Sequence, residues 1–384
     1  MSGNVSMRFV SSMEKVFPGK EPGRPIERIS ALKNERLNFQ LVVISLFERK
    51  GECKWKIKGA LASYARVRIV DFAKGYYNNR PDSDDYVIFH DCGVTLYPEI
   101  LRTPDYTDLS LYPDVFRALW ITVYAPEGLP AGEHDFTVEL CDWMGEPLAE
   151  ETLKVRIIDA ELEKNDLIVT NWLHYDCIEA YYGEKIFSEG YYALLGKFMT
   201  SAFSHGINTV YTPLFTPPLD TQRGGERRTV QTVGVKATEE GYEFDFTELE
   251  KFVKFARARG AEYFELSHLA TQWGAQFCPK IMAEEHGEIK RIFGWDTPST
   301  GEAYKSFLAA FLPRLVGRLK EWGIKDRCLL HISDEPSGAH LPTYLKLKEF
   351  IDVYAEGIPV ADALSEYEFY RRKAVDLPVV DIYN

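Results

Sequence analysis

Short apolar segments between turn residues fill the chain from Met7 to about Glu163, and in two of them, Glu133–Leu140 and Thr152–Ile158, apolar and polar positions alternate. A period of two is typical of β-strands with one buried face. No convincing helical periodicity interrupts these segments, and turn residues separate them. The pattern therefore predicts an N-terminal β-sandwich domain over residues 1–163. Its predicted strands include Leu37–Ile44, Arg66–Val70, Ala118–Tyr124, Glu133–Leu140 and Thr152–Ile158.

The pattern changes between Asp159 and Asp166, after which apolar runs alternate with segments of helical spacing. Strands are predicted at Leu167–Trp172, Thr209–Thr212, Tyr263–Ser267, Cys328–Ile332, Pro359–Ala361 and Pro378–Tyr383. Helices are predicted at Gly190–His205, Phe246–Arg259, Gly301–Trp322, Pro342–Glu356 and Tyr367–Lys373. A hairpin is expected over 231–246, and long loops over 213–228 and 272–300.

This alternation predicts a parallel sheet with right-handed crossovers. Residues 164–384 are accordingly expected to form an α/β domain of the (β/α)8 TIM barrel type, with its site on the loops that follow the strands. A full barrel needs about eight strand–helix units, and the chain supplies about six. The barrel is therefore expected to be incomplete, and the chain to be truncated before the end of the barrel.

Two neighbouring carboxylates, Asp334 and Glu335, end the apolar run Cys328–Ile332, and Pro336 follows them. Ligands of parallel sheets bind beyond the carboxyl ends of the strands, so a substrate could reach this pair. Adjacent residues of a regular strand point to opposite faces, and a turn at Pro336 would let both reach one site. The alternative is a helix N-terminus with Asp334 as its cap.

Adjacent carboxylates cannot easily lie on opposite sides of a sugar, as the acid and the nucleophile of an ordinary retaining glycosidase do. They suit a substrate whose 2-acetamido group supplies the nucleophilic oxygen. Glu335 would protonate the leaving oxygen and later activate water, and Asp334 would accept the acetamido N–H and stabilise positive charge. The proximity of the two groups is expected to raise the pKa of one of them, as the role of the acid requires.

Composition narrows the class of protein. Hydrophobic residues make up 45% and charged residues 27% of the 384 residues, as in a soluble globular protein, and the net charge of -13 argues against nucleic acid and anionic membranes as partners. The N-terminus does not read as a signal peptide, and no apolar run is long enough to span a membrane. Six scattered cysteines without a CxxC pair indicate free thiols in a cytoplasmic protein, and neither a metal nor another cofactor is expected.

Three parts of the sequence resemble glycoside hydrolase family 123, the retaining β-N-acetylgalactosaminidases: residues 170–177 with 213–218, residues 266–274, and residues 331–336. The resemblance spans essentially the whole chain, because the family also has a β-sandwich before its barrel. It implies the substrate-assisted roles of Asp334 and Glu335 and a carbohydrate substrate with a terminal β-linked N-acetylhexosamine, above all N-acetylgalactosamine. The barrel of the family continues past the position of Asn384.

Polar and aromatic residues after the first three predicted strands of the barrel are candidates for substrate binding or for packing beneath the loops. They are Trp172, His174, Asp176, Tyr211, His268 and Trp273, of which Trp273 is the best candidate for an aromatic platform under the sugar. His331 is expected in the core rather than on a metal. A basic cluster is formed by Arg223, Arg227 and Arg228, and it is expected to lie on a solvated loop. The alternative is that this cluster binds an acidic sugar. Three rival functions stay open: a non-catalytic carbohydrate-binding protein, a glycosidase for a different sugar, and a metal-dependent barrel hydrolase.

Overall fold

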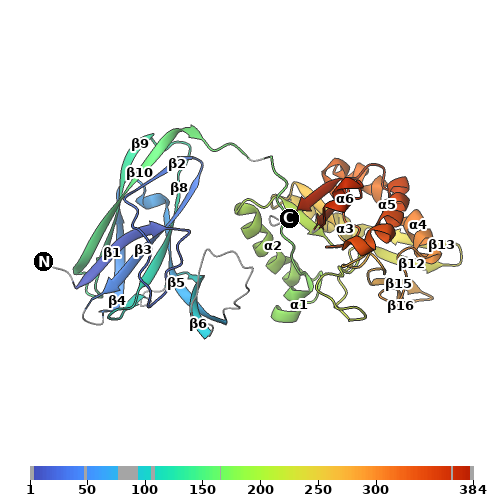
Figure 1. The fold of residues 1–384 in the computed structure, drawn as a ribbon, viewed down its shortest axis with the longest axis horizontal. Coiled ribbons are helices and arrows are strands. Elements are labelled where there is room, and N and C mark those ends of the chain that lie inside the picture. Colours follow the sequence, from blue (N-terminus) through green and yellow to red (C-terminus); the bar gives the residue numbers. More distant parts are fainter. Residues whose placement is uncertain are drawn as a thin grey trace. The chain divides into compact units, whose positions relative to one another are not determined.

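A computed structural model describes residues 4–46, 50–76, 94–104, 109–164, 166–364 and 366–380. The chain divides into two compact units, Met1–Asn165 and Asp166–Asn384. The first unit consists mainly of strands, and the labelled α-helices all belong to the second (Figure 1). Cys92 and the end of the strand predicted at Pro378–Tyr383 lie outside the described residues.

Two five-stranded sheets form the first unit. One has the order β1 (Val5–Ser11), β3 (Arg36–Ser45), β8 (Arg117–Tyr124), β5 (Ala65–Tyr76) and β6 (Val94–Arg102), and each neighbouring pair is antiparallel. The other has the order β2 (Arg28–Lys33), β10 (Pro147–Glu161), β9 (Gly132–Cys141), β4 (Lys50–Lys58) and β7 (Leu109–Leu111). Its β2–β10 pair is parallel and its other pairs are antiparallel.

The two sheets share one core, because alternate residues of their strands point inward. Phe39 of β3 and Phe136 of β9 are both fully buried, and their rings meet edge to face at 5.4 Å between centroids. Phe9 of β1 contacts both rings. Face-to-face contact through alternating apolar residues defines a β-sandwich, as the alternation in the sequence predicts.

The second unit contains five parallel strands in sequential order. They are β11 (Thr209–Thr212), β14 (Tyr263–Leu266), β17 (Cys328–Leu330), β18 (Ala361–Leu364) and β19 (Leu377–Val380), and a single parallel bridge between Leu330 and Val360 joins β17 to β18. The helices between successive strands are α3 (Thr247–Arg257), α4 (Glu302–Glu321), α5 (Leu341–Tyr354) and α6 (Tyr367–Arg371), and α1 (Asp176–Tyr182) and α2 (Glu189–Ser204) precede β11. Sequential parallel order places the carboxyl end of every strand at the same edge.

Local sequence explains where these helices begin, end and bury their side chains. The Ser188 side chain accepts a hydrogen bond from the N–H of Tyr191 at the start of α2, and Gly206 follows the end of α2 with a φ of 97°. In α3 the predicted apolar face is buried: Leu249, Phe252, Val253 and Ala256. These side chains belong to the same buried core as residues of the parallel strands, such as Phe264 and Leu330.

Two predictions for this unit were wrong. Leu167–Trp172 is not a strand: the side chain of Leu167 is 65% exposed, and Val169 is held by hydrogen bonds with Asn208 and Thr209 rather than by a ladder. The expected loop over 272–300 contains the hairpin of β15 (Ile281–Glu285) and β16 (Glu288–Phe293). Its turn, His286-Gly287, has φ of 51° and 83°, as a type I′ turn requires, and Gly287 was the sequence signal for it.

The hairpin expected over 231–246 is present as β12 (Gly234–Thr238) and β13 (Gly241–Asp245), and it joins β15 and β16 in a four-stranded sheet. Five parallel strands fit part of a barrel, and the closed (β/α)8 form stays a prediction. Within the described residues, none of the helices combines the length and the apolar character that crossing a bilayer requires.

Candidate active site

Asp334 and Glu335 lie just beyond β17, where the chain leaves the sheet and contacts the loop that follows β14. The backbone N–H of Trp273 donates to the carbonyl of Asp334 at 2.8 Å, and the hydroxyl of Ser333 donates to the carbonyl of Thr271 at 2.8 Å. Glu335 has a φ of 43°, which breaks the alternation of a strand, and its side chain is exposed while Asp334 is half-buried. The pair therefore faces outward at the rim of the sheet. The alternative, Asp334 as a helix cap, is wrong, because the next helical turn begins at Gly338 and its N-cap is Ser337.

The loops at this rim contain residues in a strained backbone conformation. Four residues other than glycine lie in the left-handed region: Asp220, Trp273, Ala275 and Glu335, with φ of 51°, 57°, 54° and 43°. They belong to the loops that follow β11, β14 and β17. Such conformations each cost about 1–3 kcal/mol and persist where the surrounding structure enforces them, which is common at active sites.

The electrostatic environment favours a proton on Asp334. Burial raises the pKa of Asp334 to about 6, helped by the negative charges of Glu335, Asp220 and Glu265 and opposed by His331. The raised pKa was expected from the proximity of the two carboxylates and for the acid role; it belongs instead to Asp334, and burial is a larger cause than the charge of Glu335. Near neutral pH this carboxyl can change its charge in response to a bound substrate.

A buried ion pair supports the rim from below. Nε2 of His331 lies 2.5 Å from Oε1 of Glu265, and both side chains are almost fully buried. Burial acts to lower the pKa of His331 and to raise that of Glu265, but the mutual hydrogen bond and charge outweigh it, so the pKa of His331 is raised and that of Glu265 is lowered. The contact with Glu265 thus favours the protonated form of His331, and its ring stacks on that of His268 at 4.6 Å between centroids. Burial and the His331 charge hold the pKa of His268 well below its usual value, so His268 is neutral.

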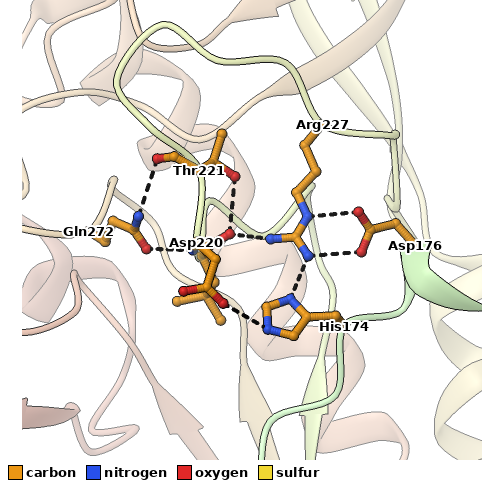
Figure 2. Close-up of polar contacts among 7 residues, drawn as sticks. His174, Asp176, Asp220, Thr221, Arg227 and Gln272 are labelled. Carbon is orange, nitrogen blue, oxygen red and sulfur yellow. Dashed lines mark hydrogen bonds and ion pairs between the residues drawn. The ribbon is translucent and has the colours of Figure 1, made fainter. Parts of the chain in front are cut away.

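A network of polar contacts anchors the loop that follows β11 (Figure 2). Arg227 donates to both oxygens of Asp176, from Nε at 2.9 Å and from Nη2 at 2.8 Å, and also to Nδ1 of His174 at 2.5 Å. Nε2 of His174 lies 2.9 Å from Oδ2 of Asp220. The prediction that Arg227 belongs to a solvated basic cluster is wrong, because its side chain is only 14% exposed and is fully engaged. Arg228 is exposed and pairs with Glu179.

The structure separates the six candidate substrate-binding residues into accessible and buried ones. Trp273 is 52% exposed and stays available as an aromatic platform, and the His174 side chain is 34% exposed. Tyr211 and His268 are buried and bond to each other at 2.7 Å, so direct sugar contact does not agree with their position. Asp176 is occupied by Arg227.

Trp172 is the remaining candidate for substrate binding. Its ring packs edge to face on His268 and His331 and lies beside the ring of Tyr211. Its partly buried ring is therefore a support beneath the rim.

Sequence reasoning missed three acidic residues in this region: Asp220, Glu265 and Asp362. Asp362 of β18 is buried, accepts a hydrogen bond from the Tyr344 hydroxyl at 2.8 Å, and has a pKa raised to about 7, mainly by burial. A carboxylate inside an apolar strand, as in Tyr263-Phe264-Glu265-Leu266, was the available signal for Glu265. Within the described ranges, no group of three or more His, Cys, Asp and Glu side chains could hold a metal ion.

An open hollow of about 470 Å³ adjoins the Arg227 network, and its lining includes His174, Asp176, Asp220, Gln222 and Arg227. Asp334 and Glu335 do not line this hollow; the loop of Asp220, which does, is bonded through Gln272 to the loop that carries Trp273. The carboxyl edge of the parallel sheet thus carries paired carboxylates and an exposed indole, with a polar hollow beside Asp220, and these are features of a hydrolase site for a polar substrate.

Comparisons with known proteins identify the family. The family model described as "Glycoside hydrolase 123, catalytic domain" matches residues 172–383, more than half of the chain. The chain therefore belongs to glycoside hydrolase family 123, and its substrate is a carbohydrate.

Among solved structures, the chain is similar to a family 123 glycoside hydrolase from Clostridium perfringens, reported for hydrolysis of glycolipid glycans. The TM-score is 0.73 at 14% identity, over 99% of this chain and 67% of that one, which supports the shared fold. A β-glucuronidase from Parabacteroides merdae matches with a TM-score of 0.29 at 10% identity, over 90% of this chain and 33% of that one, too low to bear on the fold. Among curated proteins, none matches the sequence significantly.

Proposed function

We propose that this protein releases terminal β-linked N-acetylhexosamine, in particular N-acetylgalactosamine, by substrate-assisted retaining hydrolysis. The observation that carries the proposal is the position of Asp334 and Glu335, adjacent in sequence and both at the accessible rim beyond β17. We also propose that the complete catalytic domain is a closed (β/α)8 barrel and that the protein is cytoplasmic.

In the first step, the acetamido carbonyl oxygen attacks the anomeric carbon while the glycosidic C–O bond breaks. Glu335 gives its proton to the departing oxygen. Asp334 accepts a hydrogen bond from the acetamido N–H, and its negative charge balances the positive charge on the oxazolinium ring. Water then attacks the anomeric carbon and passes a proton to Glu335, which restores the acetamide and retains the configuration. The exposed Glu335 can reach a leaving group, whereas the half-buried Asp334 suits a fixed contact with the amide.

The direct test compares two chromogenic substrates, 4-nitrophenyl N-acetyl-β-galactosaminide and the matched β-galactoside without the acetamido group. Hydrolysis of the first alone is expected. Equal hydrolysis of both would indicate a glycosidase of different specificity, and binding without turnover would indicate a carbohydrate-binding protein. Loss of activity with a chelator would indicate the metal-dependent alternative. Because the Clostridium perfringens relative is reported for glycolipid glycans, an oligosaccharide released from a glycolipid is the natural second substrate.

The pH dependence of kcat/KM tests the role of Asp334. Because burial raises the pKa of Asp334 to about 6, the carboxyl is neutral below that pH and ionised above it. Only the ionised form can balance the positive charge of the intermediate, so kcat/KM is expected to rise with pH through about 6. In Asp334→Asn this acidic limb should disappear, together with most of the activity. An unchanged limb in the variant would assign it to another group.

A further inference from the structure

Asp220 lies at the same rim as the proposed catalytic pair, although the chemistry above gives it no role. Its backbone N–H donates to Oε1 of Gln272 at 2.9 Å. The next residue, Trp273, donates its N–H to the carbonyl of Asp334 at 2.8 Å. The loops after β11 and β17 are thus both bonded to the loop after β14. The Asp220 charge also contributes to the raised pKa of Asp334, which agrees with this proximity.

A series of contacts fixes the Asp220 side chain (Figure 2). Arg227 donates to Nδ1 of His174, and a guanidinium has no acceptor, so Nδ1 carries no proton. The neutral imidazole must therefore hold its proton on Nε2, which lies 2.9 Å from Oδ2 of Asp220. The bidentate contact with Asp176 in turn orients Arg227, and these two side chains are 14% and 15% exposed.

The carboxylate at the end of this series is open to solvent. The Asp220 side chain is 80% exposed, and among the described residues none donates to its Oδ1. Anchoring the loop does not require it, because Gln272 already bonds the backbone of both Asp220 and Thr221. A fixed carboxylate with unused acceptor capacity, beside the open hollow, is suited to accept hydrogen bonds from hydroxyl groups.

We propose that Asp220 is a third substrate-contacting carboxylate, which accepts hydrogen bonds from hydroxyl groups of the sugar bound at Asp334 and Glu335. Asp176, Arg227 and His174 are positioning residues that act through it. The inference rests on the proposed function, because the ligand is the same sugar.

Binding of free N-acetylgalactosamine to the full chain, followed by NMR titration, tests the contact separately from turnover. Asp220→Ala is expected to weaken binding about tenfold, the effect of losing about one hydrogen bond to an exposed charged acceptor. Asp326→Ala is the matched control, because this exposed aspartate precedes β17 at the opposite end of the strand. The control should bind like the unmodified protein, and melting temperatures should show that both variants fold.

A double-mutant cycle tests the positioning role. Asp176→Asn should weaken binding in the unmodified protein and have almost no further effect in the Asp220→Ala background, since it acts through Asp220. A merely structural role would give the same loss in both backgrounds and would overturn the positioning claim.

The outcomes distinguish this inference from the proposed function. Unchanged affinity in Asp220→Ala, with binding and turnover intact in the unmodified protein, would overturn the inference alone. If the unmodified protein neither bound nor hydrolysed any 2-acetamido sugar, the proposed function and the inference would both be overturned. Weaker binding in Asp220→Ala but not in Asp326→Ala would support the contact, whether or not the sugar is turned over.

Discussion

Replacing Glu335 with Gln is expected to lower kcat on the chromogenic N-acetyl-β-galactosaminide about a thousandfold, within the range that general acid–base catalysis contributes. The amide keeps the shape of the side chain but can neither give a proton to the leaving oxygen nor take one from water. Because Glu335 is exposed, the variant should unfold at the same temperature as the unmodified protein. Steady-state kinetics and a thermal melt measure the two effects.

Glu356→Gln is the matched control for this variant. Glu356 is also exposed and has a left-handed φ of 50°, and it pairs with Lys320 rather than with residues of the rim. Its replacement should leave kcat unchanged. A less than tenfold loss in Glu335→Gln would contradict the role of Glu335 as the acid and base.

Replacing Glu265 with Leu should destabilise the second unit by about 3 kcal/mol, because it leaves a buried histidine without its counter-ion. The value falls at the low end of the range for buried pairs, since His331 can release its proton. Glu265 also accepts a hydrogen bond from the hydroxyl of Thr170, which the change removes as well. Denaturant unfolding at about pH 6 measures the loss.

The double variant Glu265→Leu/His331→Leu should recover much of that stability, because apolar residues of similar volume often replace a buried pair with little loss. If the double variant were as unstable as the sum of the single ones, the pair would not act as a unit.

The ion pair also predicts how stability depends on pH. The pKa of Glu265 is lowered on folding, so its contribution is present above about pH 4.5 and is lost as the pH falls through the folded pKa. The pKa of His331 is raised, so its contribution is complete below about pH 6.5 and is lost as the pH rises through the folded pKa. The pair therefore contributes fully between about pH 4.5 and 6.5, and the double variant should lack this dependence.

The hydrophobic pattern by itself determined most of the fold. Strands such as Glu133–Leu140 and the helix at Phe246–Arg259 were predictable because each buries one face, and burial of one face imposes a period on the sequence. The same logic placed Asp334 and Glu335 at the end of a buried strand. It failed at Leu167–Trp172, where an apolar run alone could not show that no neighbouring strand pairs with it.

Only the tertiary structure decided which polar groups meet. Asp176 and Arg227 are 51 residues apart, and Glu265 and His331 are 66 apart, so no local period relates them. The outward turn of Glu335 depends on a left-handed backbone that the loop after β14 holds in place. Apolar burial repeats along the chain and can be read from it, whereas a hydrogen bond or ion pair between distant segments depends on where folding places the two partners.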